Sequence, residues 1–254
     1  AAGPGGAAGP GGGAVKLTFL GTRGHIDARS PRHARHAALL VEYEGRRVMV
    51  DCGADWRGHL DEVAPHAIVL THGHPDHLFG LQDGAACPVH ATAETWRDAE
   101  DYPVEARREV RPRQPVAIEG IRFEAFPVEH STRCPAVGYR IAAGRVAIFY
   151  GPDLVHIHDA EPALAGLSLY VGDGSTLERS FVRRRGEHLI GHAPVRTQLT
   201  WCRKAGVAEA VFTHCGAEIV AGDPEEVAAR LRDLADERGV TAGIAEDGQT
   251  RVLR

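Results

Sequence analysis

Apolar runs rich in β-branched residues alternate with amphipathic segments along most of the chain. In the first half this pattern predicts strands followed by helices, with a hairpin turn at Glu44 and Gly45. The expected strands are residues 15–20, 37–43, 47–51, 67–71 and 88–90, and the expected helices are residues 56–63, 77–81 and 94–100.

The second half repeats the order of strands and then helices. The expected strands are residues 121–128, 136–142, 145–150, 167–171, 209–213 and 241–245, and the expected helices are residues 157–165, 195–205 and 224–238. Because no linker or change of composition separates the halves, we expect one domain over residues 15–254. The duplicated order predicts an α/β fold, an αββα sandwich of two mixed β-sheets flanked by helices.

Composition narrows the cellular compartment and the partners that we expect for this domain. Residues 1–14 carry no charge and no apolar core, which predicts a flexible tail of Gly, Ala and Pro. The apolar runs are too short for a membrane helix, so we expect no membrane partner. Five scattered cysteines without a CxxC pair favour the reducing cytoplasm. The net charge of −5 means that any polyanion must be held by a local basic patch.

The strongest chemical signal is the segment HGHPDH at residues 72–77, which directly follows an apolar strand. In an extended turn, residues two apart project to the same side, so His72 and His74 can converge on one cation. Asp76 and His77 lie where the chain begins to coil, and they can face a second cation nearby. This spacing predicts a metal site.

Further ligand-type residues stand at the ends of other predicted strands. His130, Asp153 and His214 each follow an apolar strand, where the backbone is rigid. Asp51 also ends a strand, and there it would accept a hydrogen bond from a metal-bound imidazole. The alternative of a purely structural zinc site is disfavoured, because such sites are closed and usually rich in thiolates.

These segments carry a family resemblance. VMVDCG, HGHPDH, EHS, GPD and THCG occur in the order found in the metallo-β-lactamase fold superfamily, which the chain resembles over residues 15–254. The resemblance implies two divalent metal ions per chain, zinc with manganese or iron as alternatives. It further implies one ion held by His72, His74 and His130, a second held by Asp76, His77 and His214, and Asp153 as a bridge between them.

Within the superfamily, LTFLGTRG and the later GHAPVRTQ and GVAEAVFTHCG are similar to ribonuclease Z and its small phosphodiesterase relatives. Ribonuclease Z enzymes usually insert a long tRNA-gripping arm before the bridging Asp, but here only 22 residues separate His130 from Asp153. We therefore do not expect tRNA 3′ processing. The resemblance implies catalytic roles for Asp76, His192 and Asp173, with Asp173 orienting His192; alternatively, His192 only caps a helix.

Two basic segments suggest an anionic substrate. The loop RGHIDARSPRHARH at residues 23–36 holds four Arg and three His against one Asp, and Arg183 to Arg185 form a second cluster. Arginine matches phosphate oxygens bidentately, whereas the alternative is a solvated face without a ligand. The expected substrate-binding residues are Arg23, His25, Arg29, Arg183 and Arg184.

Together these features predict a dinuclear metal-dependent phosphodiesterase of the nuclease or cyclic-nucleotide type. Two metals about 3.5–4 Å apart would present a bridging hydroxide to phosphorus, and His192 would assist the leaving oxygen. The partner would be an anionic phosphoester, a nucleic acid or a cyclic nucleotide. Two alternatives remain, an acyl hydrolase of thioesters or lactones on the same metals, and a nucleic-acid-binding module with a vestigial site.

Overall fold

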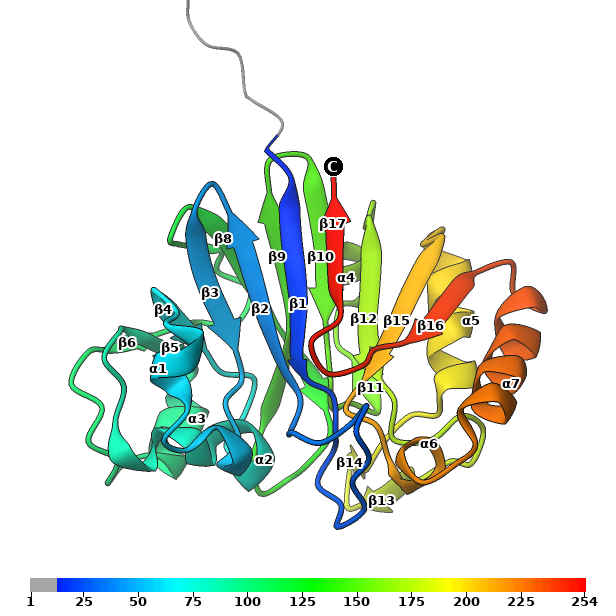
Figure 1. Cartoon of the computed structure of the whole chain (residues 1–254), viewed down its shortest axis with the longest axis horizontal. Helices are drawn as coiled ribbons and strands as arrows, with labels where there is room; N and C mark the ends of the chain where they lie inside the picture. The colour runs from blue at the N-terminus through cyan, green and yellow to red at the C-terminus, as the bar shows by residue number, and fades with distance from the viewer. Residues whose placement is uncertain (1–12) are drawn as a thin grey trace, which may run out of the picture.

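Two β-sheets packed face to face form the centre of the molecule, with helices on both outer sides (Figure 1). The computed structural model describes residues 13–254, so most of the predicted tail, residues 1–12, lies outside the described residues. Both sheets mix parallel and antiparallel pairs. The expected αββα sandwich is confirmed.

The first sheet has seven strands in the order β17-β1-β2-β3-β4-β5-β6. Its first four strands in this order are antiparallel, and β3 to β6 are parallel. The bounds are β1 Val15–Gly21, β2 Ala38–Tyr43, β3 Arg46–Val50, β4 Ala67–Val69, β5 Val89–Ala91, β6 Arg107–Glu109 and β17 Thr250–Leu253.

The second sheet has eight strands in the order β11-β8-β9-β10-β12-β15-β16, with β7 paired to β8. A separate two-stranded sheet joins β13 to β14. The bounds are β7 Val116–Ile118, β8 Ile121–Glu129, β9 Ala136–Ala143, β10 Val146–Tyr150, β11 His156–Ile157, β12 Leu169–Asp173, β13 Arg183–Arg185, β14 His188–Ile190, β15 Glu209–Thr213 and β16 Thr241–Ile244.

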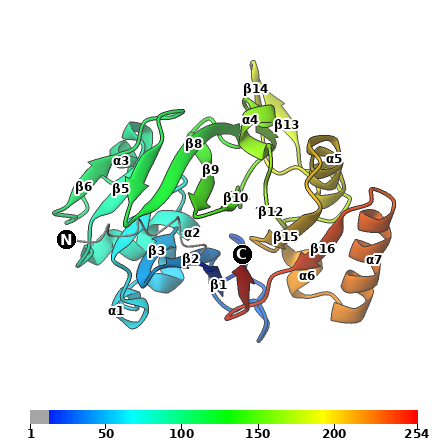
Figure 2. The same cartoon turned by 90° about the horizontal axis from the view of Figure 1, so that it is seen from above.

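The helices cover the outer faces of the two sheets. On the second sheet, α5 packs on β12 and β15, and α7 packs on β16, as Figures 1 and 2 show. No helix among residues 13–254 combines the length and the apolar character needed to cross a bilayer. The bounds are α1 Leu60–Val63, α2 Pro75–Leu78, α3 Ala93–Asp98, α4 Ala160–Leu164, α5 Val195–Ala205, α6 Ala217–Val220, α7 Pro224–Asp236, and the 3-10 helices η1 Ala54–Trp56 and η2 Phe79–Asp83.

Three apolar cores hold the layers together. The central core lies between the sheets and includes Phe19 of the first sheet and Phe123 of the second. A second core, with Tyr170, lies under the helices of the second sheet, and a third, with Met49 and Trp56, lies under those of the first. Alternating residues of the strands therefore face different cores, as expected for sheets buried on both sides.

Several short elements differ from the sequence expectation. The helix expected at residues 56–63 is the pair η1 and α1, interrupted near Gly58, whose φ of +74° lies in the left-handed region. The helix expected at residues 77–81 is likewise α2 followed by η2. The strands β6, β7, β11, β13, β14 and β17 and the helix α6 were not predicted, because most are too short to show a periodicity.

Strand direction brings the chemical residues to one edge of the sandwich. β8, β10, β12 and β15 all run the same way, since β9 is antiparallel to both β8 and β10, and the other pairs are parallel. The carboxyl ends of β3 and β4 lie at the same edge, because hydrogen bonds from β9 hold the segment that follows β4 against the second sheet there. Open α/β sheets bind their ligands at the carboxyl ends of strands.

Two hydrogen bonds join the sheets at this edge. The buried hydroxyl of Tyr139 on β9 donates to the carbonyl of Leu70, which follows β4, at 3.0 Å. The amide of Val137 donates to the carbonyl of Thr71 at 3.1 Å. The segment that enters HGHPDH is therefore held to the opposite sheet by backbone and side chain alike.

We predict that Tyr139→Phe destabilises the protein by about 1–3 kcal/mol, because the substitution leaves the buried carbonyl of Leu70 without a donor. Urea unfolding should show a lower midpoint with an unchanged m-value. Tyr102→Phe, which alters a half-buried tyrosine, is the matched control. Equal midpoints for Tyr139→Phe and the unaltered protein would contradict the prediction.

Candidate metal centre

The HGHPDH segment changes from extended to helical backbone within its six residues. His74 is the N-cap of α2, with extended φ and ψ of −69° and 153°, and Pro75 occupies the first turn. Proline favours this place because its φ already suits a helix and it needs no amide donor there. His72 and His74 thus project from extended chain, whereas Asp76 and His77 project from the first turn of α2.

The first cluster gathers three imidazoles and a carboxylate. Nδ1 of His74 lies 3.0 Å from Nε2 of His72 and 3.1 Å from Nε2 of His130. Oδ2 of Asp153 lies 3.5 Å from Nε2 of His72. The structure thus brings together the first ligand set that the resemblance implies.

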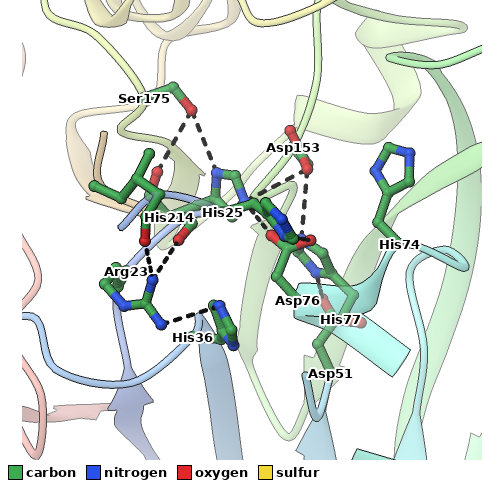
Figure 3. Close-up of polar contacts among 12 residues, drawn as sticks. Arg23, His25, His36, Asp51, His74, Asp76, His77, Asp153, Ser175 and His214 are labelled. Carbon is green, nitrogen blue, oxygen red and sulfur yellow. Dashed lines mark hydrogen bonds and ion pairs between the residues drawn. The ribbon is translucent and has the colours of Figure 1, made fainter. Parts of the chain in front are cut away.

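The second cluster shares Asp153 with the first. Oδ2 of Asp76 lies 3.3 Å from Nε2 of His77 and 3.0 Å from Nε2 of His214. Oδ2 of Asp153 lies 3.4 Å from Nε2 of His77 and 3.5 Å from Nε2 of His214. Asp153 therefore stands between the two clusters, in the place that a bridging ligand requires (Figure 3).

The donor atoms fit divalent cations. Around a tetrahedral zinc ion with bonds of about 2.1 Å, neighbouring ligand atoms lie roughly 3.4 Å apart, close to the spacings of both clusters. Burial lowers the pKa of His72, His74 and His130 to about 4, so their ring nitrogens carry lone pairs at neutral pH. The buried Nε2 of His77 also has no hydrogen-bond partner among the described residues.

Asp51 orients the imidazole of His77 through the ring nitrogen that faces away from the cluster. Its carboxylate accepts hydrogen bonds from the amide and the hydroxyl of Thr71 at 2.8 and 2.9 Å, and from Nδ1 of His77 at 2.9 Å. This leaves Nε2 of His77 as the atom that faces the cluster. Asp51 has a φ of +63°, a left-handed conformation that costs a non-glycine residue free energy and is often found at functional sites.

His192 borders the centre and is held by a second carboxylate. Its Nδ1 donates to Oδ2 of Asp173 at 2.8 Å and lies 2.8 Å from Oδ1 of Asp153. Burial lowers the pKa of His192, but Asp173 and Asp153 outweigh it and raise that pKa well above its ordinary value. The contact with Asp173 is the one that the resemblance implies.

A cleft of about 830 Å³ opens above both clusters. Of the residues expected from the sequence, His25, His74, Asp76, His130, Asp153, His192 and His214 line it. Among the lining residues that sequence reasoning missed are Ser175, Arg179, Phe181 and Glu218. Ser175 belongs to the GDGS segment, and its hydroxyl lies 3.1 Å from Nδ1 of His192. No sequence motif pointed to Arg179, Phe181 or Glu218.

The structure gives Arg23 a different role from the expected contact with substrate. Its side chain is only 2% exposed. The guanidinium pairs with Asp55 at 2.5 Å. It also lies 3.0 Å from Nε2 of His36 (Figure 3). Arg29 pairs with the same Asp55 at 2.9 Å. Neither arginine lines the cleft, because Asp55 draws both of them to the base of the loop.

The other expected substrate residues are divided between the cleft and its surroundings. His25 lines the cleft, and its Nδ1 lies 3.3 Å from Oδ1 of Asp76; this contact raises the pKa of His25 against the effect of burial. Arg183 and Arg184 stand exposed on β13 and are not among the lining residues. Arg179 is the arginine that the structure places at the cleft wall.

Comparison with known proteins agrees with this geometry. The sequence model of the beta-lactamase superfamily domain matches residues 46–215, which include all seven expected ligands. The chain belongs to the beta-lactamase superfamily. Its fold and its buried His and Asp clusters make this family member a metal-dependent hydrolase with a His/Asp metal site.

Individual relatives cover nearly the whole chain. A ribonuclease Z from Methanopyrus kandleri is 28% identical over 94% of this chain and 98% of its own length. The metallo-beta-lactamase fold protein YhfI from Bacillus subtilis has a TM-score of 0.74 at 17% identity, covering 95% of this chain and 100% of its own. A diphosphatase of the PhnP family has a TM-score of 0.72 at 22% identity, covering 94% and 97%.

We predict that Asp51→Asn weakens metal binding about 10- to 100-fold, because the amide nitrogen of Asn would face the Nδ1–H of His77 as a second donor. Competition with a chromophoric chelator measures the affinity. Asp101→Asn, at an exposed position after α3, is the matched control and should bind metal normally. An unchanged affinity for Asp51→Asn, with folding verified by circular dichroism, would show that this contact does not orient a ligand.

Proposed function

We propose that this hydrolase is a dinuclear, zinc-dependent phosphodiesterase of the nuclease or cyclic-nucleotide type. One observation carries the proposal: two cationic side chains, His192 and Arg179, face the same cleft as the paired clusters. An anionic phosphoester at the metals would meet both, because they lie where its flanking oxygens must be held. A neutral acyl substrate needs neither.

The ligands favour zinc, with manganese or iron as alternatives, because five of the seven donors are imidazoles. His72, His74, His130 and Asp153 would hold one ion, and Asp76, His77, His214 and Asp153 the other. When bound, such a pair of cations makes water nucleophilic near neutral pH and stabilises negative charge on phosphoryl oxygens.

The chain's own residues would supply the remaining steps. His192 would give its proton to the leaving oxygen, while Asp173 keeps Nδ1 of the ring engaged and so directs Nε2 to the cleft. Arg179 would bind a non-bridging oxygen of the phosphate or of its neighbour. His25 would pair with the carboxylate of Asp76 and, because it lines the cleft, would also contact the substrate.

The names of two relatives support a function on phosphate compounds. The ribonuclease Z and the diphosphatase both act, by their names, on phosphate esters or anhydrides. We propose that residues 15–254 form a single catalytic domain, since the two sheets share one core. The five cysteines are all free, which supports the reducing cytoplasm as its compartment.

A second candidate is an acyl hydrolase of thioesters or lactones on the same metal site. The observation that favours it is the apolar part of the cleft wall, formed by Ile26, Pro75, Phe181 and Ala217. These side chains would suit an acyl chain as well as a base. A nucleic-acid-binding module with a vestigial site is less well supported, because every expected ligand is present and brought together.

We predict that the zinc-loaded protein cleaves bis-p-nitrophenyl phosphate and at least one of a cyclic nucleotide and a single-stranded oligonucleotide. Elemental analysis after reconstitution should give about two metals per chain, and chelation should abolish turnover. His74→Ala, which removes one ligand, is the negative control. Turnover of thioesters or lactones with all phosphodiesters left intact would refute the phosphodiesterase assignment.

A second prediction concerns His192 alone. His192→Asn should slow cleavage of a nucleotide phosphodiester about 10²- to 10⁴-fold, because an alkoxide leaving group needs a proton. It should slow bis-p-nitrophenyl phosphate far less, because p-nitrophenolate leaves without one. The control is His156→Asn, an exposed histidine on β11. Equal slowing of both substrates would indicate a structural role for His192.

A further inference from the structure

The hairpin of β13 and β14 carries the densest cationic surface beside the cleft. Arg183, Arg184 and Arg185 are consecutive and exposed, and the hairpin forms a sheet of its own that projects from the body (Figure 2). Within the described residues none of the three forms an ion pair. The one side-chain hydrogen bond among them runs from Arg185 to Oγ1 of Thr132 at 3.4 Å.

Some other exposed arginines have carboxylate partners, whereas Arg122, Arg145 and Arg254, like the hairpin arginines, have none among the described residues. Arg57 pairs with Asp83 at 2.7 Å, and Arg230 pairs with Glu178 at 2.5 Å. The chain as a whole carries a net charge of −5. Three adjacent guanidinium groups without such partners repel one another, so an external anion would stabilise this arrangement.

Backbone contacts hold the hairpin in a fixed place relative to the metal centre. The amide of Gly191 donates to the carbonyl of His130 at 2.9 Å, and Nδ1 of His130 lies 3.1 Å from the carbonyl of Gly191. Gly191 has a φ of +104°, and a Cβ there would lie 2.1 Å from the carbonyl oxygen of Phe181. The base of the hairpin is therefore closed tightly beside a ligand-type histidine.

An exposed aromatic ring lies at the cleft, two residues before the hairpin begins. Phe181 is 37% exposed, and the guanidinium carbon of Arg179 lies 5.3 Å from its ring centroid. Both side chains line the cleft. A flat apolar ring with a neighbouring guanidinium offers a stacking surface for an unpaired base, whereas a paired base in a duplex keeps both of its faces covered.

We propose that the β13–β14 hairpin binds the backbone of a single-stranded nucleic acid whose scissile phosphate lies at the metal centre. Arg183 and Arg185, which project to the same face of β13, contact neighbouring phosphates, and a base stacks on Phe181. Arg133 is exposed in the loop that Arg185 touches, and it extends the same surface. This inference rests on the proposed phosphodiesterase function, and it names the substrate as a strand longer than a mononucleotide.

The experiment measures binding separately from cleavage. Zinc-loaded protein is titrated into a fluorescein-labelled, single-stranded DNA of about 12 nucleotides, with phosphorothioate linkages to slow hydrolysis. The test variant is R183A/R184A/R185A. The control variant is R122A/R145A/R254A, which removes the same charge from exposed positions near the other ends of the strands. Affinity is measured at several salt concentrations.

The hairpin variant should bind at least about tenfold more weakly than the control at low salt, and the slope of log K against log salt should fall by about 1.4, or roughly 0.7 for each of two lost phosphate contacts. Phe181→Ala should lose about tenfold in affinity with an unchanged slope, and Phe181→Tyr should retain it. A matched duplex should bind less tightly than the single strand.

Equal affinities and slopes for the hairpin and control variants would overturn the proposal. Tighter binding of the duplex, or no effect of Phe181→Ala, would overturn the assignment to single strands. The failure of the proposed function is a separate result, because it is measured as the absence of bis-p-nitrophenyl phosphate hydrolysis by the unaltered zinc-loaded protein.

Discussion

The centre of this protein depends on one carboxylate, Asp153, buried between two groups of imidazoles. Its oxygens lie within 3.5 Å of ring nitrogens of His72, His77 and His214. Burial raises the pKa of Asp153, but His130 and the other histidines outweigh that effect and hold the pKa well below its ordinary value. A buried charge of this kind is tolerated only with such compensation, and divalent cations would complete it.

The fold supplies this arrangement through the direction of its strands. Side chains at the carboxyl ends of β8, β10, β12 and β15 converge at one edge, and the hydrogen bonds of Tyr139 and Val137 bring the first sheet against them. Positive φ angles at Asp51 and His214 show that the chain turns sharply as it leaves β3 of the first sheet and β15 of the second. Large cores behind both sheets offset the cost of that strained edge.

Charge is distributed unevenly between the cleft and its surroundings. The chain is acidic as a whole, yet His192, Arg179 and the β13–β14 hairpin place cations along one side of the metal centre. Arg23 and Arg29, in contrast, are neutralised by Asp55 and stabilise the loop that supports His25. A basic segment in the sequence can therefore either place cations beside the metal centre or stabilise a loop through ion pairs. Only the position of the nearby carboxylates distinguishes these two roles.

By itself the sequence determined the sandwich, the ligand-type residues and the Asp173 partner of His192. It could do so because several ligand-type residues follow apolar strands, and because the motifs, in their order along the chain, carry a family resemblance that implies the full ligand set and the pairing of Asp173 with His192. The tertiary structure decided what local pattern does not contain. Burial beside Asp55 removed Arg23 from the cleft, and the packing of Gly191 against Phe181 brought Arg179 and Phe181 into it. Which side chains line the cleft depends on contacts between residues far apart in the chain. The periodicity of apolar and polar positions does not predict such contacts.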